Sequence, residues 1–188
     1  MRIYTKRGDD GTTGLLFGGR VPKNAKRIEV NGAVDEAQAA LGVARAELAR
    51  GSELADLLVA IERDLWVLMA EVATAPANRK KLVGGQSLVT KEMVAALEAR
   101  IDELSEHTSM PTEFVVPGEN PPSAALDVAR TAVRRAERVA VSLPMPGSLV
   151  VQYLNRLSDL VWTMARVAEG ADHRTARSGP GRPTTKGA

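Results

Sequence analysis

One apolar stripe constrains the fold of this chain more than any other feature. Between residues 54 and 72, apolar side chains recur every three or four positions, which is the spacing of one face of an α-helix. The stripe consists of Leu54, Leu57, Leu58, Ile61, Leu65, Leu68, Met69 and Val72. Ser52 precedes it as a candidate N-cap, and Pro76 ends it. Such a helix must bury its apolar face against other helices, so we expect a helical bundle.

Four more segments show the helical period and complete the expected bundle. They cover about residues 27–50, 90–104, 121–141 and 148–169. Pro121 and Pro122 suit the first turn of one of these helices, and Thr90 can cap another. Aromatic residues make up only 3% of the chain, so its core must be aliphatic, which suits close helix packing. The predicted fold is all-α, a five-helix bundle that is mostly up-and-down.

Two connectors and the C-terminus lie outside the helical pattern. We predict a loop over residues 77–88, and a proline-rich connector over residues 110–123 with a short β-like core around Val115. The C-terminal residues are mostly Arg, Ser, Gly, Pro and Thr, a composition typical of disorder. The predicted organisation is therefore one helical domain over residues 1–170 and a disordered basic tail over residues 171–188.

The composition argues against several classes of function. The chain has no cysteine, which excludes a disulfide framework, a thiolate metal site and a cysteine nucleophile. Its two histidines, His107 and His173, are far apart and neither belongs to a Glu-x-x-His motif, which argues against a di-iron site. The small net charge of +2 and the lack of interleaved aromatics argue against a nucleic-acid partner. No apolar run approaches the length of a membrane span, so we expect no membrane partner and a cytoplasmic location.

The first 25 residues have no regular period and are unusually polar. The stretch GDDGTTG at residues 8–14 spaces three glycines three positions apart. Glycines at this spacing let successive backbone N–H groups face a common anion, and the threonines and nearby cations add donors. The segment could instead be a disordered terminus. Its apolar residues favour an ordered one, and we expect Ile3, Tyr4 and Leu15 to hold it against the bundle. We therefore predict an ordered anion-binding loop that suits a polyphosphate, with one of its two aspartates contacting Mg²⁺ or a hydroxyl.

Polar residues also align on single faces of two predicted helices. Arg130, Arg134 and Glu137 are separated by four and three positions, so they share one face. A similar stripe on the last helix consists of Asn155, Asp159 and Arg166. Both stripes also fit ordinary solvated faces with local ion pairing. Asp35, which lies among alanines and glycines, fits either an exposed carboxylate or one paired with a cation at a helix contact.

Four sequence blocks resemble the PduO-type ATP:cob(I)alamin adenosyltransferases, in that family's order. IYTKRGDDGTTGLLFGGRVPK resembles the family's phosphate-binding opening, and RIEVNGAVDEAQAALG resembles its first-helix signature. FVVPGENPPSAALDVARTAVRRAER resembles its most diagnostic block, and YLNRLSDLVWTMAR resembles its last-helix motif. The blocks span nearly all of residues 3–169, and four ordered motifs are far more specific than any one of them.

The resemblance implies a homotrimer of helical bundles with active sites between neighbouring subunits. The implied reaction moves the 5′-deoxyadenosyl group of ATP to the cobalt of cob(I)alamin and gives adenosylcobalamin and tripolyphosphate, with Mg²⁺ as cofactor. Cobalt(I) is itself the nucleophile, so the protein needs no catalytic base and must supply geometry and charge. Implied partners are a reductase that supplies cob(I)alamin and an adenosylcobalamin-dependent enzyme. Two alternatives are an adenosylcobalamin-binding chaperone or sensor with little turnover, and a helical interaction protein with a disordered N-terminus.

For ATP, the resemblance assigns roles by position. The residues that match the family's ATP loop and the adjacent helix entry are Thr5, Lys6, Gly8, Asp9, Gly11, Thr12, Thr13, Lys23 and Arg27. Arg134 and Glu137 match residues that contact ATP and its metal, and Asn155 matches a nucleotide-contacting asparagine.

For the corrinoid, Asp35 and Arg130 match a pair that forms a salt bridge between subunits near both substrates. Phe114 matches an aromatic residue that displaces the lower axial ligand of the corrinoid. The chain departs from the family on this side. Asp127 stands where the family often has histidine, and residues 119–120 are Glu-Asn where it usually has Gly-Ser.

Overall fold

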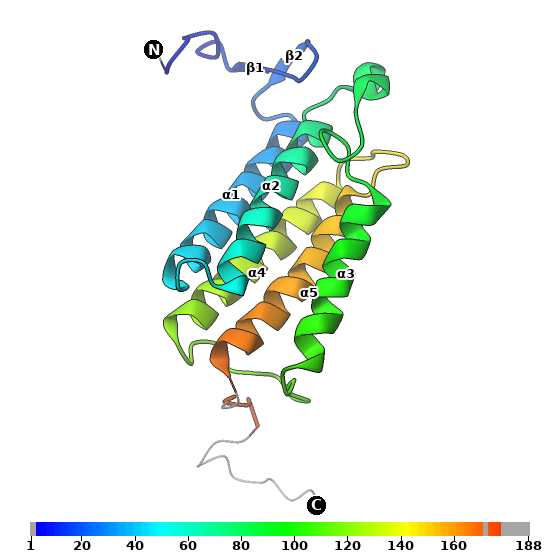
Figure 1. The fold of residues 1–188 in the computed structure, drawn as a ribbon. Helices are drawn as coiled ribbons and strands as arrows, with labels where there is room; N and C mark the ends of the chain where they lie inside the picture. The colour runs from blue at the N-terminus through cyan, green and yellow to red at the C-terminus, as the bar shows by residue number, and fades with distance from the viewer. Residues whose placement is uncertain (1–2, 171–172, 178–188) are drawn as a thin grey trace, which may run out of the picture.

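The computed structural model describes residues 3–170 and 173–177 of the chain, and most of this part is helical. Five α-helices, α1 (Lys26–Glu47), α2 (Glu53–Val72), α3 (Lys91–Glu106), α4 (Pro121–Val141) and α5 (Val150–Glu169), run alternately in opposite directions along one axis (Figure 1). The mostly helical class predicted from the sequence is confirmed. Within the described residues, none of the helices combines the length and the apolar character that crossing a bilayer requires.

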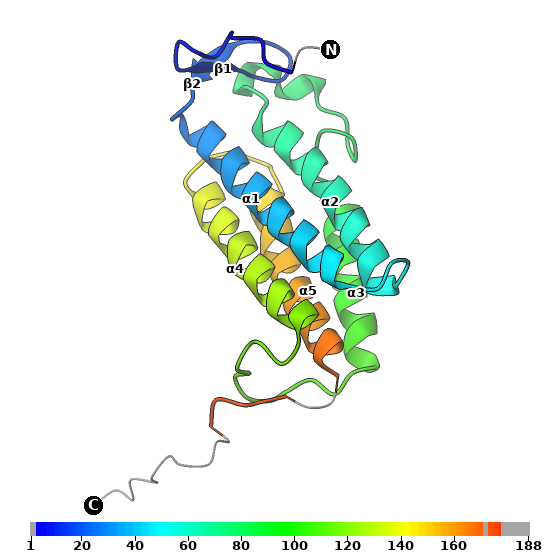
Figure 2. The same ribbon diagram turned by 90° about the vertical axis from the view of Figure 1, so that its left-hand side faces the viewer.

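The middle of the bundle is α4, which packs against both α1 and α5 (Figure 2). The outer helices α2 and α3 pack on α1 and α5 respectively. Buried alanines, among them Ala37 on α1 and Ala129 and Ala136 on α4, let these helices approach closely. Leucines and valines fill the remaining core, as the low aromatic content predicted.

Side-chain caps define where three of the helices begin. Ser52 accepts a hydrogen bond from the Ala55 N–H, and Thr90 accepts one from the Met93 N–H, so both predicted caps are confirmed. Asn120 caps α4 by accepting from the Ser123 N–H at 2.9 Å. Its Nδ2 also donates to the Ala168 carbonyl at 2.8 Å, which ties the start of α4 to the end of α5. This second bond gives a structural reason for asparagine at position 120.

The N-terminal segment contains a short hairpin that the sequence pattern did not predict. Strands β1 (Thr12–Gly14) and β2 (Arg20–Pro22) pair antiparallel, and three-residue strands are too short to show a period. The hairpin turn is held by two bonds to the α2 side of the bundle. The Leu16 N–H donates to the Ala73 carbonyl, and Asn78 Nδ2 donates to the Phe17 carbonyl. Asn78 belongs to a 3₁₀ helix, Pro76–Lys81, within the stretch expected to be a loop.

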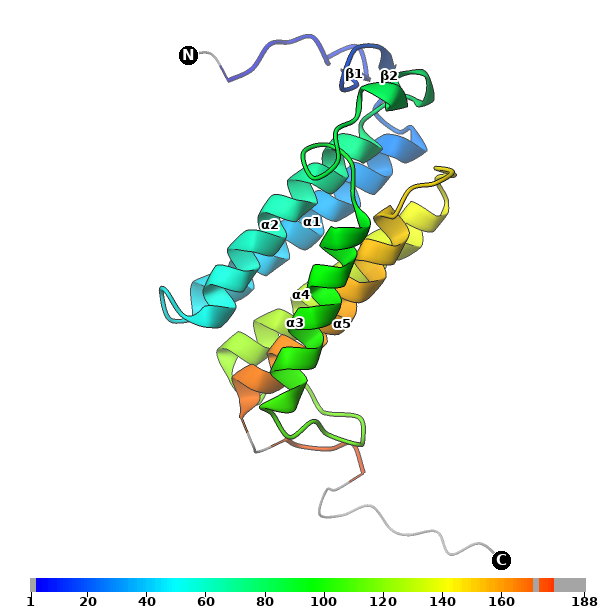
Figure 3. The ribbon, with the colours of Figure 1, turned by 45° about the vertical axis from the view of Figure 1, so that its right-hand side comes forward.

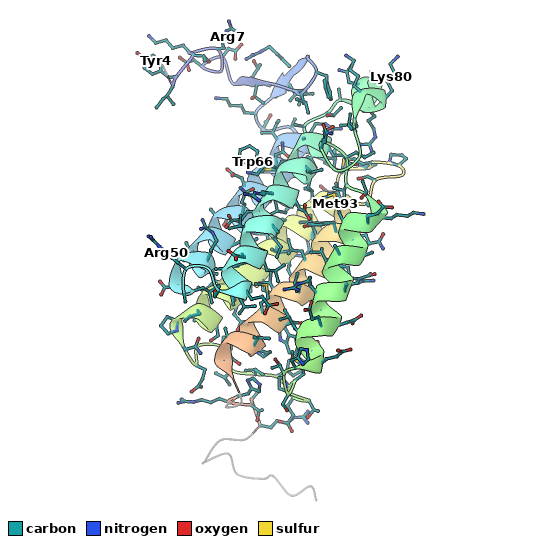
Figure 4. The ribbon with its side chains drawn as sticks, viewed as in Figure 1. Tyr4, Arg7, Arg50, Trp66, Lys80 and Met93 are labelled. Carbon is teal, nitrogen blue, oxygen red and sulfur yellow. The ribbon has the colours of Figure 1, made fainter. Side chains whose placement is uncertain are left out.

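The expected apolar anchors of this segment are wrong for two residues. Ile3 is 95% exposed and Tyr4 is 63% exposed. Tyr4 and Arg7 lie at the outer end of the segment, away from the helices (Figure 4). The segment is therefore held by backbone bonds from the hairpin turn rather than by its first apolar side chains.

The connector between α3 and α4 lies at the opposite end of the bundle (Figure 3). Its β-like core is paired, because the Val116 N–H donates to the Arg174 carbonyl and the Ala176 N–H donates to the Phe114 carbonyl. The expectation of a disordered tail therefore does not hold for residues 173–177. The rest of that tail, residues 171–172 and 178–188, lies outside the described residues.

A buried phenol joins α5 to α2. Tyr153 is fully buried, and its hydroxyl donates to Asp64 Oδ2 at 3.0 Å. Burial raises the pKa of the Asp64 carboxyl above its ordinary value, and the hydrogen bond from Tyr153 offsets only part of that rise. Because the folded-state pKa is raised, the cost of holding this carboxylate is present at neutral pH and disappears below the unfolded-state pKa.

We predict that Asp64→Asn stabilises the protein at about pH 7 by up to about 1 kcal/mol, a figure reduced for the partial exposure of this group. The amide oxygen still accepts from Tyr153, but the desolvated charge is gone. The advantage should shrink as the pH falls to about 4. Chemical denaturation of both proteins at the two pH values measures it, and an advantage that grows toward acid would contradict the assignment.

Candidate active site

The N-terminal segment forms a compact turn around the amino group of Lys23. The Gly11 N–H donates to the Gly8 carbonyl, and the Lys23 N–H donates to the Gly11 carbonyl at 2.9 Å. A Cβ at Gly8 would lie 3.2 Å from both Lys23 Nζ and the Thr12 carbonyl oxygen, so only glycine fits without displacing a neighbour. The predicted loop residues Gly8, Gly11 and Thr12 are thus brought together with Lys23. The Lys23 amino group lies beside this turn, where it and backbone N–H groups of the loop can bind the same anion.

Arg20 organises this loop, although no sequence pattern had indicated it. Arg20 donates from Nε to Thr12 Oγ1 at 2.9 Å and from Nη2 to the Arg7 carbonyl at 2.5 Å. Asp10 accepts from the Thr12 N–H and hydroxyl, and these bonds lower the pKa of the Asp10 carboxyl. Arg20 pairs with Gly14 across the hairpin, and this position beside the loop is evident only when the pairing of the two strands is known.

Arg27 is used within the chain at the entry of α1. Its Nη1 donates to the Val72 carbonyl at the C-terminus of α2, where a cation also complements the helix dipole. Burial lowers the pKa of the Arg27 guanidinium, and the nearby charge of Arg79 lowers it further. Arg79 pairs with the buried carboxylate of Glu71 at 2.9 Å. The other oxygen of Glu71 accepts from the Val89 N–H, so this cluster fixes the loop beside the hairpin.

On α4 and α5, two of the predicted nucleotide residues are in direct contact. Asn155 Nδ2 donates to Glu137 Oε1 at 3.0 Å, and Arg156 Nη1 donates to Asn155 Oδ1 at 3.0 Å. Arg134 lies one turn before Glu137 on α4 and is exposed. These residues lie toward the bundle end that carries the hairpin, because α4 ends there and α5 begins there (Figure 1).

A metal at this site would have one protein carboxylate available. Among the described residues, no group of three or more His, Cys, Asp or Glu side chains is arranged to hold a metal ion. Glu137 is only partly buried and is oriented by Asn155. One carboxylate is compatible with Mg²⁺, which in nucleotide sites is usually bound by one or two carboxylates together with substrate phosphates and water.

At the opposite end of the bundle, a cavity of about 500 Å³ brings together two of the three predicted corrinoid residues, Phe114 and Arg130, whereas Asp35 does not line it. Its wall combines the connector with α4 and α5, and includes Phe114, Asp127, Arg130, Trp162 and Arg166. Phe114 is 88% exposed, so its ring is available to a ligand. An aromatic ring beside guanidinium groups suits a large ligand that is apolar on its faces and polar at its edge.

Buried charges support one wall of this cavity. Arg166 is 1% exposed, so the alternative of a solvated face is wrong for this residue, whereas Asp159 of the same stripe is exposed. Arg166 Nη2 donates to Asp127 Oδ2 at 2.7 Å and to Glu169 Oε1 at 2.8 Å. Asp127 also accepts from Arg130 Nε at 3.0 Å.

Asp35 and Arg130 are not paired within one chain. Asp35 is exposed and makes no ion pair in the described part of the structure, while its neighbour Glu36 pairs with Arg135 on α4. Because Glu36 is paired with Arg135, the adjacent Asp35 lies near the position of Arg135 along the bundle axis. Arg130 comes five positions before Arg135, so it lies about 7 Å closer to the start of α4 at about 1.5 Å per residue.

The described site lies within a region that matches a protein-family model. Residues 3–168 match the model described as cobalamin adenosyltransferase.

The chain belongs to the cobalamin adenosyltransferase family.

The family expected from the sequence is therefore confirmed. A corrinoid adenosyltransferase of Citrobacter freundii is 41% identical over 171 residues, which cover 89% of this chain and 95% of that protein. One from Bacillus subtilis is 36% identical over 187 residues, 96% of this chain and 90% of that protein.

A solved structure agrees with the fold of this cobalamin adenosyltransferase. It is a variant PduO-type ATP:corrinoid adenosyltransferase from Lactobacillus reuteri, complexed with cobalamin and ATP. The TM-score is 0.81 at 28% identity, and the match covers 94% of this chain and 100% of that one.

We predict that Gly8→Ala weakens ATP binding about tenfold or more, because the new methyl group meets Lys23 Nζ and the Thr12 carbonyl. Calorimetric titration with MgATP measures the change. Gly14→Ala is the matched control, since a Cβ at Gly14 meets no atom within 4 Å. Equal affinities of the two variants would show that the Gly8 turn does not hold the nucleotide.

Proposed function

We propose that this cobalamin adenosyltransferase transfers the 5′-deoxyadenosyl group of ATP to the cobalt of cob(I)alamin at a site shared between subunits of a homotrimer. Family membership and the similarity to corrinoid adenosyltransferases support this activity. The observation that supports the residue roles is their order along α4. Glu137 and Arg134 face the nucleotide end, and Arg130 faces the cavity end. Neither that membership nor those relatives favour the alternative of a chaperone or sensor.

Helix α4 sets the distance between the two substrates. Arg130 and Glu137 are seven positions apart, which is about 10 Å along a helix that rises about 1.5 Å per residue. Both belong to the face of α4 that also carries Arg134. A nucleotide whose phosphates lie near Arg134 and Glu137 can therefore direct its ribose toward Arg130 and the cavity. Holding two reactants at a fixed distance removes much of the entropic barrier to their reaction.

The chemistry asks the protein for charge stabilisation rather than for proton transfer. Cobalt(I) donates an electron pair to C5′ of the ribose, a Co–C bond forms, and the C5′–O bond breaks. The bonding electrons leave with the tripolyphosphate, and the cobalt ends formally as cobalt(III). Lys23, placed beside the Gly8 turn, and Arg134 on α4 supply positive charge for the leaving group. A reductase that supplies cob(I)alamin and an enzyme that uses adenosylcobalamin are the partners this reaction predicts.

Glu137 is proposed to hold Mg²⁺ together with the triphosphate, and Asn155 to orient that carboxylate through the 3.0 Å bond. The ion, when bound, neutralises phosphate charge. In addition, the second donor of the Asn155 amide group remains for the nucleotide.

A second copy of the chain would complete the corrinoid side of the site. Asp35 is exposed and makes no ion pair within the described part of its own chain, so its carboxylate is available to Arg130 of a neighbouring subunit. Exposed apolar side chains on the same two helices support a subunit contact there. Val43 on α1 is 60% exposed and Val128 on α4 is 63% exposed. Homo-oligomers with closed symmetry bury such patches, and a ring of three is the assembly we propose.

We predict that Arg134→Ala and Asn155→Ala each lower turnover by about 100-fold or more, through lost contacts to the charged nucleotide. The test is anaerobic: chemically reduced cob(I)alamin and MgATP are mixed with enzyme, and the visible spectrum is followed for a light-sensitive Co–C product. Arg138→Ala removes an exposed cation one turn from Arg134 and serves as the control. Wild-type rates in either variant, with unchanged thermal unfolding, would refute these two roles. Absence of any Co–C product with the wild-type enzyme would refute the activity.

A further inference from the structure

A line of buried charges crosses the corrinoid end of the bundle. Asp127 on α4 bonds to Arg166 on α5, and Arg166 bonds to Glu169 one turn later. Glu169 contacts His173 Nδ1 at 2.8 Å, just before the segment that pairs with the connector. In this line the buried guanidinium of Arg166 already has a second carboxylate partner in Glu169. Asp127 is therefore free to balance another cation.

That other cation is Arg130. The Asp127 side chain is only 5% exposed, while Arg130, one turn later on α4, is 26% exposed and lines the cavity. An arginine that is about a quarter exposed can be solvated and does not require a buried partner. A buried carboxylate, by contrast, is destabilising unless cations pair with it. Asp127 therefore needs the contact more than Arg130 does.

The geometry of the contact leaves one edge of Arg130 available. Asp127 Oδ1 accepts from Arg130 Nε at 3.0 Å. The guanidinium has five N–H donors in a rigid plane, and four of them are on its two terminal nitrogens. In the described part of the chain these terminal nitrogens form no recorded bond. Both Asp127 and Arg130 line the cavity, and a carboxylate on the Nε edge restrains the guanidinium while its terminal nitrogens stay available to a ligand there.

We infer that Asp127 is a positioning residue for the reaction. It restrains the Arg130 guanidinium through Nε, so that the two terminal nitrogens are presented to the corrinoid and to Asp35 of the partner subunit. The inference rests on the proposed role of Arg130. It also gives a role to the carboxylate at position 127, which accepts hydrogen bonds from two arginines, Arg130 and Arg166.

The test uses the full-length enzyme and the variant Asp127→Asn, which keeps the shape and removes the charge. We expect kcat/KM for cob(I)alamin to fall about tenfold or more, while KM for ATP changes less than about twofold, because the nucleotide residues lie toward the other end of α4. A second readout does not need turnover. The Kd of cob(II)alamin in the presence of MgATP, titrated by visible absorbance, should rise by a similar factor.

A double-mutant cycle separates positioning from a structural role. In the Arg130→Ala background, Asp127→Asn should change neither readout further, because its effect passes through Arg130. The matched control is Glu103→Gln, which removes the carboxylate of an exposed pair, Arg100–Glu103, at the same one-turn spacing on α3. It should leave both readouts unchanged.

Two results would overturn the inference. One is an unchanged corrinoid Kd and kcat/KM in Asp127→Asn. The other is an equal loss with and without Arg130, which would assign Asp127 to the fold alone. If Asp127→Asn proves too unstable, Asp127→Asn with Arg166→Met removes one buried charge of each sign and is compared with Arg166→Met alone. The inference requires that Asp127→Asn still raises the Kd of cob(II)alamin and lowers kcat/KM when Arg166→Met is present in both proteins. If the wild-type enzyme binds cob(II)alamin but forms no Co–C bond, the proposed activity fails while the Kd comparison still decides the role of Asp127.

Discussion

The packing of α4 between α1 and α5 is the constraint on which the other features of this enzyme depend. Alanines such as Ala129 and Ala136 are fully buried on this helix, so its inner face has little room to move. That rigidity gives the polar face of α4 fixed positions for Arg130, Arg134 and Glu137. A helix held on two sides is a better support for a reaction centre than a loop, because small displacements of reacting groups are costly. The proposed path from triphosphate to cobalt follows this one element.

Each end of the bundle carries a non-helical segment that a few hydrogen bonds hold in place. At the nucleotide end, the hairpin is tied to α2 through Leu16 and to the 3₁₀ helix through Asn78. At the corrinoid end, the connector that carries Phe114 pairs with residues 173–177. The restraints are a few hydrogen bonds to the backbone of these segments rather than a large apolar contact. Segments held in this way can open locally at small cost, which suits loops that must admit large substrates.

Periodicity predicted the helices well because each one buries a wide apolar stripe and several carry recognisable caps. Ser52 and Thr90 are caps that local sequence alone identifies. The hairpin escaped prediction because its strands are only three residues long, and Arg20 escaped with it. Arg166 escaped for a different reason. Spacing shows which residues share a helix face, but not whether that face meets solvent or another charge.

The corrinoid side depended most on tertiary information. The sequence motif indicated Arg130 and Asp35, but the structure shows that Arg130 already has a partner, Asp127, in its own chain. The residue at position 127 is a buried carboxylate that accepts hydrogen bonds from both Arg130 and Arg166. Nothing in local sequence identifies such a contact, because Arg166 is 39 positions away on another helix.

Mixing two kinds of mutant subunit tests directly whether two chains build one active site. Asp35→Ala and Arg130→Ala are each expected to have little activity in Co–C bond formation from cob(I)alamin and MgATP. When the two variants are co-expressed and assemble at random, about a quarter of the interfaces regain both residues, so about a quarter of wild-type activity should return. If mixed assemblies form and their activity does not exceed that of the separate variants, Asp35 and Arg130 of two subunits do not form one shared active site.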